Sequence, residues 1–145
     1  MPEPASPAPQ PGLSIGQAAL RSGLSVHALR FYEREGLLAS PVERTADGRR
    51  VYSEHDLEWL ELCIKLRSSG MPLAAIRRYT ELVRQGPGNE QDRLTILREH
   101  QQRVTAQIGA LTECLDMITF KVALYEDSLA DGAADPIWGP CPAKA

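Results

Sequence analysis

The 145-residue sequence predicts a mostly α protein in which a winged helix-turn-helix domain is followed by one long helix. Three observations support this fold class. Residues 13–86 contain short amphipathic segments separated by glycines, a basic hairpin signal lies among them at residues 41–52, and residues 89–129 carry a heptad repeat. We expect residues 1–12, which are rich in proline, to be a disordered tail, and residues 130–145 to be a C-terminal tail.

The first two helices are predicted from their caps and from the glycine between them. Ser14 can cap the first helix, with Gln17 reaching back as in a capping box. Gly23 suits a turn that needs a positive φ, and Ser25 can cap the second helix.

Two amphipathic helices joined at a tight glycine turn form the helix-turn-helix pattern, whose second helix enters the major groove of DNA. Leu29 faces inward on this second helix. Arg30 and Tyr32 lie on the same helix and are both suited to phosphate contact.

A basic hairpin follows the second helix. Asp47-Gly48 is a strong hairpin turn signal, and Val51 and Tyr52 suit the returning strand. In isolation, its three arginines would also fit a solvated surface loop. Next to a helix-turn-helix, they favour a wing that contacts the DNA backbone. The arginines are Arg44, Arg49 and Arg50.

Two more helices complete the front domain. Ser53 and Asp56 form a second capping-box pair, and Trp59 is expected to be partly buried against the wing or the next helix. Pro72 is expected to start the fourth helix. The apolar positions predicted for the two helices are Leu57, Leu60, Cys63, Ile64 and Leu66, then Leu73, Ile76, Tyr79 or Thr80, and Val83; Arg77 and Arg78 are interpreted as a solvated face rather than phosphate contacts.

The last helix carries a single apolar seam. Asn89 can cap it, and Gln101 is the one polar position in the repeat. A helix of about 38 residues would be roughly 57 Å long, more than the front domain could cover. A stripe with nothing in its own chain to bury it predicts a homodimer. The seam is Leu94, Leu97, Val104, Ile108, Leu111, Leu115, Ile118, Val122, Tyr125 and Leu129.

Composition excludes several classes of protein. The net charge is −3, but residues 13–86 hold 11 basic and 9 acidic side chains, whereas residues 87–145 hold 5 and 9. No apolar run is long enough to span a membrane. Three scattered cysteines do not make a disulfide framework, which favours a cytoplasmic setting. No nucleophile partner for a histidine and no phosphate-cradling glycine loop is evident, so we expect no enzyme and no cofactor.

The sequence resembles the MerR family of bacterial transcription regulators. The resemblance rests on four stretches: SIGQAALRSGLS at 14–25, LRFYEREGLL at 29–38, RRVYSEHDL at 49–57 and GMPLAAIR at 70–77. It covers residues 13–86, and the long helix matches the family's antiparallel dimerisation helix, a coiled coil in the homodimer.

This resemblance implies a homodimer on a pseudo-palindromic promoter site. Such regulators distort the DNA when induced, which brings the promoter elements into register for RNA polymerase. An effector or stress signal would shift the balance by binding two protein states with different affinity. The DNA-binding residues carried over are Ser14, Ser25, His27, Arg30, Tyr32, Arg44, Arg49, Arg50 and Tyr52, although His27 could equally be a merely exposed side chain.

The effector is left open among an electrophile, a small ligand and a metal. Two stretches, DLEWLELCIKLRSSGMPLAAIRRY and CLDMITFKVALYE, resemble the aldehyde- and electrophile-responsive branch. Lys65 stands where that branch has its reactive cysteine, and Cys63, two residues earlier, is a possible sensor thiol but fits a core position better. Cys114 is favoured as a half-buried apolar residue, and its separation from Cys141 does not support a metal site.

A protein-interaction adaptor is the main competing function. It would use the winged fold and the coiled coil without binding DNA. The basic hairpin and Arg30 argue against it. A DNA-binding regulator should lose affinity steeply as salt rises, and an adaptor should not.

Overall fold

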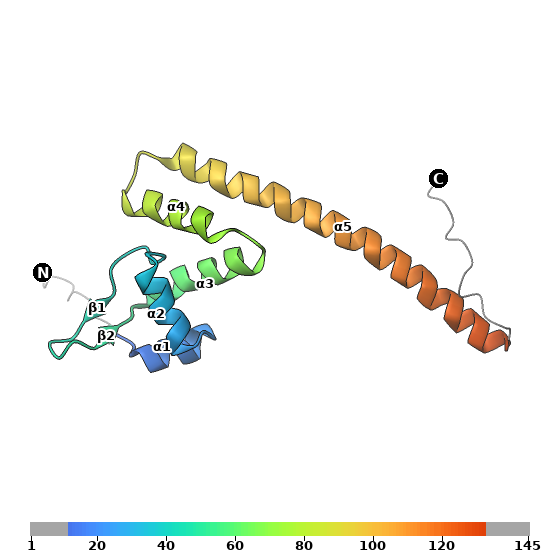
Figure 1. The fold of residues 1–145 in the computed structure, drawn as a ribbon, viewed down its shortest axis with the longest axis horizontal. Coiled ribbons are helices and arrows are strands. Elements are labelled where there is room, and N and C mark those ends of the chain that lie inside the picture. Colours follow the sequence, from blue (N-terminus) through green and yellow to red (C-terminus); the bar gives the residue numbers. More distant parts are fainter. Residues whose placement is uncertain (1–11, 133–145) are drawn as a thin grey trace, which may run out of the picture. The chain divides into compact units, whose positions relative to one another are not determined.

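The structure, a computed structural model, describes residues 12–132. The two predicted tails, with Cys141, therefore lie outside the described residues, apart from Gly12 and residues 130–132. The chain divides into two compact units, Met1–Arg98 and Glu99–Ala145. Figure 1 shows the elements, which are α1 (Ile15–Ser22), α2 (Val26–Arg34), β1 (Glu43–Arg44), β2 (Arg50–Val51), α3 (Glu54–Ser68), α4 (Leu73–Arg84) and α5 (Glu90–Asp131).

The predicted caps of the helix-turn-helix are present. The Ser14 hydroxyl accepts a hydrogen bond from the Gln17 backbone at 3.2 Å, and the Gln17 side chain accepts one from the Ser14 backbone at 2.9 Å. Gly23 ends α1 with a φ of 75°, a value that favours glycine. The Ser25 hydroxyl then caps α2 through the Ala28 backbone at 3.0 Å. These local contacts set where the second helix begins.

The wing is a short antiparallel hairpin. β1 and β2 pair Glu43 with Val51 and Arg44 with Arg50. Gly48 takes a φ of 85° in the turn, as the Asp-Gly signal predicts. A bridge between Leu13 and Tyr52, with backbone hydrogen bonds of 2.8 Å in both directions, joins the wing to the residue before the α1 cap.

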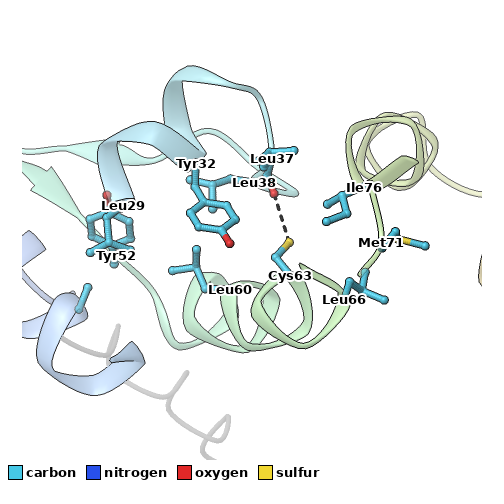
Figure 2. Close-up of a cluster of buried hydrophobic side chains, with 11 residues drawn as sticks. Leu29, Tyr32, Leu37, Leu38, Tyr52, Leu60, Cys63, Leu66, Met71 and Ile76 are labelled. Atoms are coloured by element: carbon cyan, nitrogen blue, oxygen red, sulfur yellow. Dashed lines mark hydrogen bonds between the residues drawn. The ribbon is translucent and has the colours of Figure 1, made fainter. Parts of the chain in front are cut away.

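The core of the first unit lies between α1, α2, α3 and α4 and is drawn in Figure 2. Its fully buried members include Leu29, Leu37, Leu60 and Ile76. Ile96 and Leu97, in the first turns of α5, also pack against it, and the first unit includes residues up to Arg98.

The fourth helix differs from the prediction in two details. Pro72 is the N-cap, and Leu73 is the first helical residue. Leu82 is buried and Val83 only half-buried, because the apolar stripe is displaced by one residue at the end of the helix. Trp59 packs against this helix as expected, with its ring stacked on Tyr79 at 5.8 Å between centroids.

The long helix α5 has 42 residues, about 63 Å at 1.5 Å per residue. It ends two residues later than predicted. Asn89 precedes the helix, and its side chain bonds other groups than the backbone N–H groups that a cap would bind: its amide donates to the Leu82 carbonyl at 2.8 Å and its oxygen accepts from the Arg93 side chain at 2.6 Å. Among residues 12–132, none of the helices has the apolar length that a bilayer requires.

Most of the predicted seam is exposed within the single chain. Ile108 is 60% exposed, Leu115 60% and Leu129 82%. In contrast, Leu97 is partly buried against the core of the first unit, and Val104 is half-buried. The seam residues beyond Val104 therefore have little of their own chain to pack against. They are Ile108, Leu111, Leu115, Ile118, Val122, Tyr125 and Leu129.

Candidate nucleic-acid interface

The exposed face of α2 carries three of the predicted DNA-binding residues. Ser25, His27 and Arg30 are all exposed, whereas Leu29 between them is fully buried. Arg30 makes no hydrogen bond or ion pair with any residue from 12 to 132. Its guanidinium is therefore available to a ligand in solution. Ser14 is also exposed, although its hydroxyl is already engaged in capping α1.

The two tyrosines predicted to contact phosphates are core residues instead. Tyr32 is 6% exposed and packs edge-on against Phe31, with ring centroids 6.1 Å apart. Tyr52 is fully buried. Burial is the main cause that raises the pKa of both phenols. Figure 2 shows both rings among the buried leucines, so the structure does not present them on the surface where they were predicted to contact phosphates.

The wing arginines differ in their surroundings. Arg44 and Arg50 both pair with Glu33 of α2, at 3.1 Å from the Arg44 terminal nitrogen to Oε1 and through the Arg50 Nε to Oε2. Arg49 is 83% exposed at its side chain, and its one ion pair with a residue from 12 to 132 is with Asp47 of its own turn, at 3.2 Å. The basic hairpin pattern predicts all three arginines but does not identify Glu33 as the partner of two of them. The only indication that the sequence gives of Glu33 is its position one helical turn after Leu29.

The segment after α2 is held by side chains from α3 and α4. The Leu37 carbonyl accepts from the Trp59 ring at 2.8 Å and lies 3.6 Å from the Cys63 sulfur. Arg77 donates to the Glu35 carbonyl at 3.2 Å and to its carboxylate at 2.7 Å. Arg84 donates to the Leu38 carbonyl at 2.7 Å. Arg77 is therefore a fixed internal contact, which corrects its interpretation as a solvated side chain.

A second ion pair fixes α1 against α3. Both terminal nitrogens of Arg21 donate to the Glu54 carboxylate, at 2.6 Å and 2.8 Å. This pairing lowers the pKa of Glu54 and raises that of Arg21. Because both side chains are exposed, the pair contributes little to stability, although its two-pronged geometry makes the contact between α1 and α3 directional.

The first unit has no exposed cysteine thiol with a lowered pKa among its described residues. Cys63 is fully buried, and burial raises its pKa to about 11, so the thiol stays protonated at neutral pH. Cys114 is exposed, which corrects the expectation that it would be half-buried in the chain. Within the described part of the chain, His, Cys, Asp and Glu side chains form no group of three that could hold a metal ion.

Comparisons with known proteins agree with this arrangement. Residues 13–82 match the family described as MerR HTH family regulatory protein, and residues 57–119 match the one described as MerR, DNA binding. An uncharacterized HTH-type transcriptional regulator of Haemophilus influenzae is 35% identical over 86% of this chain and 91% of its own length. The regulator AdhR of Bacillus subtilis is 37% identical over 63% of this chain and 65% of its own.

Solved structures share the fold. HiNmlR, described as a MerR family regulator lacking the sensor domain and bound to promoter DNA, superposes with a TM-score of 0.75 at 34% identity, over 84% of this chain and 96% of its own. A MerR family regulator of Listeria monocytogenes gives a TM-score of 0.78 at 30% identity, over 83% and 90%. Together with the capped α1 and α2, the basic hairpin and the long α5, these matches show that the chain belongs to the MerR family of DNA-binding transcriptional regulators, which are not enzymes.

Proposed function

We propose that this regulator binds a two-fold symmetric promoter site as a homodimer, with α2 in the major groove and the wing on the neighbouring phosphates. The observation that carries the proposal is that α2 and the basic wing are joined side by side through Glu33. A groove-reading helix and a backbone-binding hairpin held together in this way suit a duplex, where bases specify and phosphates position.

Each exposed residue has a distinct part in this arrangement. Ser25 and His27, at the start of α2, approach the base edges, since the N-terminal residues of a recognition helix reach deepest into the groove. Arg30, one turn later, binds a phosphate. Arg49 and Arg50 bind the backbone from the wing. Tyr32 and Tyr52 support these residues from the core rather than touching DNA.

The homodimer is supported by the exposed seam of α5. The seam continues for about three heptads beyond Val104 on one face of an uninterrupted helix. A second copy offers the same apolar face, and an antiparallel pairing would bury both stripes. Dimerisation through α5 then relates two copies of α2 by a dyad, as a pseudo-palindromic site requires.

Control of transcription follows from the energy of DNA deformation. Bending or untwisting a promoter costs of order 1–6 kcal/mol, and an effector that prefers one protein state shifts that balance for RNA polymerase. A place near the aldehyde- and electrophile-responsive branch is supported by the two stretches that resemble it, DLEWLELCIKLRSSGMPLAAIRRY and CLDMITFKVALYE. Burial of Cys63 disfavours this thiol as the sensor. If a Cys63→Ser variant no longer induces transcription in response to aldehydes, Cys63 would be the sensor after all.

A nuclease footprint on the DNA upstream of its own gene and on neighbouring promoters is the direct test. We expect a protected site about two helical turns long with symmetric half-sites. The footprint should weaken steeply as salt rises. No protection on any of these promoters at low salt would favour the adaptor function instead.

Arg30→Ala sharpens this test. Loss of a phosphate contact should weaken binding to all sequences and lower the slope of log K against log salt by about 0.9. The matched control is Arg103→Ala, which removes the same charge from an exposed position on α5. Equal salt slopes for the two variants would contradict the assignment of Arg30.

A further inference from the structure

An acidic side chain stands in the middle of the proposed phosphate-binding surface. Glu33 belongs to α2, one turn after the buried Leu29 and three residues after Arg30. A carboxylate at such a place repels phosphates, so its presence needs a compensating role. Its contacts with the wing indicate what that role is.

Glu33 connects the recognition helix to both strands of the wing. Its Oε1 accepts from Arg44 of β1 at 3.1 Å, and its Oε2 accepts from the Nε of Arg50 of β2. The Glu33 side chain is only 24% exposed, and that of Arg50 is 25% exposed. Partial burial makes these charge-assisted hydrogen bonds stronger than pairs that are fully in water.

The two arginines are left with different free groups. Arg44 uses its other terminal nitrogen to donate to the Gly48 carbonyl at 3.1 Å, so it closes the hairpin from within. Arg50 uses only Nε, and its two terminal nitrogens meet no acceptor among residues 12–132. A guanidinium held at Nε presents its outer edge in one fixed plane, which is the edge that binds a phosphate in two-pronged fashion.

We propose that Glu33 is a positioning residue for DNA binding, which fixes the wing to α2 and orients the outer edge of Arg50 toward a backbone phosphate. This inference rests on the proposed function and adds a specific role for a residue of opposite charge. Glu33 itself does not touch DNA. The repulsion from its charge is outweighed because Arg50 is oriented before binding, so less conformational entropy is lost on contact.

The chain provides a matched control in the same hairpin. Asp47 pairs with Arg49 at 3.2 Å, but both side chains are well exposed, at 61% and 83%, and the pair lies within one turn. Asp47→Asn removes the same charge as Glu33→Gln without loosening the wing from α2. If negative charge near the DNA only repelled phosphates, both variants would bind more tightly and by similar factors.

The experiment measures affinity for the footprinted site by fluorescence anisotropy across a salt series. We expect Glu33→Gln to weaken binding about tenfold, the size of one charge-assisted hydrogen bond, and to lower the salt slope by about 0.9. Arg50→Ala should do the same, and the double variant should bind no more weakly than either single one. Asp47→Asn should keep or slightly raise affinity.

Three outcomes would overturn the proposal: unchanged or tighter binding by Glu33→Gln, additive losses in the double variant, or a weakened Asp47→Asn. Thermal melting of each variant separates a lost contact from a lost fold. Arg50→Lys is the second probe, because a lysine keeps the charge but has no planar fork that could bind a phosphate in two-pronged fashion while Glu33 orients it, so it should bind nearly as weakly as Arg50→Ala.

The controls also separate this inference from the proposed function. If wild-type protein binds the site and Arg30→Ala weakens it while Glu33→Gln does not, only the role of Glu33 is wrong. If wild-type protein binds no promoter DNA, the proposed function and the role of Glu33 are both wrong.

Discussion

The two units of the chain use similar apolar side chains with opposite results. In the first unit, Leu29, Leu37 and Leu60 are fully buried in a core built by helices α1 to α4. In the second, Leu111 and Leu115 are at least 60% exposed on one face of a single helix. Burying a leucine contributes about 1.5–3 kcal/mol, so the second unit leaves much stabilisation unused within one chain.

The two units therefore differ in what they need to bury their apolar side chains. The first unit has a core of its own, fixed by caps and by side-chain contacts to the backbone after α2. The outer part of α5 carries only an apolar heptad repeat, and the same repeat on a second copy of the chain can bury it. Folding of the first unit should therefore be independent of protein concentration, and burial of the seam should depend on it.

The largest expected effect comes from a charge placed in the seam. Ile118→Glu would bury an unpaired carboxylate in the proposed dimer, so we expect monomers by sedimentation and a loss of operator affinity of about 100-fold or more. Ala106→Glu is the matched control, since Ala106 is exposed and lies on the face opposite the seam. A dimeric Ile118→Glu protein would rule out the seam as the interface.

The second-largest effects are expected when one leucine side chain is truncated to alanine in each unit. Leu60→Ala removes a fully buried side chain and should lower the free energy of unfolding by about 2–5 kcal/mol at every protein concentration. Leu115→Ala should instead lower the dimer association constant, so its melting temperature should depend more strongly on concentration than that of wild type. Identical behaviour of the two variants in chemical denaturation at several concentrations would contradict the comparison.

A smaller effect concerns alkaline pH. Burial raises the pKa of Cys63 from 9.0 to about 11, so the folded protein holds this proton more tightly than the unfolded chain does. The contribution to stability is complete below about pH 9 and is lost as pH rises toward about 11. Cys63→Ala should show a flatter decline of stability over this range, measured by urea denaturation, with Cys114→Ala as the control.

The smallest expected effect is at Tyr52. Its hydroxyl is buried and has no hydrogen-bond partner among the described residues. An unsatisfied buried hydroxyl costs about 1–3 kcal/mol, so Tyr52→Phe should raise the free energy of unfolding by about 1 kcal/mol. Operator affinity should be unchanged, since Tyr52 is not exposed. A clear loss of stability would show that the hydroxyl has a partner that the structure lacks.

Local signals allowed much of the fold to be predicted from the sequence. Ser14, Gly23 and Ser25 act through neighbours within a few residues, and each took the predicted role. The heptad repeat placed the end of α5 within two residues. Both kinds of signal are short in range or periodic, which is why they can be recognised without knowing the tertiary structure.

The site was harder to predict, because it depends on contacts between distant residues. Glu33 pairs with side chains 11 and 17 positions away, and no pattern in the sequence specifies such a partner. Tyr32 and Tyr52 carry a polar group on an apolar ring, so composition allows both a surface and a core position. Tertiary packing decides between the two positions, and it places both rings in the core of the first unit.

The contacts that hold residues 35–38 have a mechanical consequence. Backbone carbonyls just after the recognition helix are hydrogen-bonded by Arg77 and Arg84 of α4, and α4 leads directly into α5 through Asn89. A rotation of α4 would pull on the end of α2 through these contacts. One set of hydrogen bonds thus ties the end of α2 to α4, and another ties α4 to the residue before α5, so the three helices are connected through side chains as well as through the chain itself.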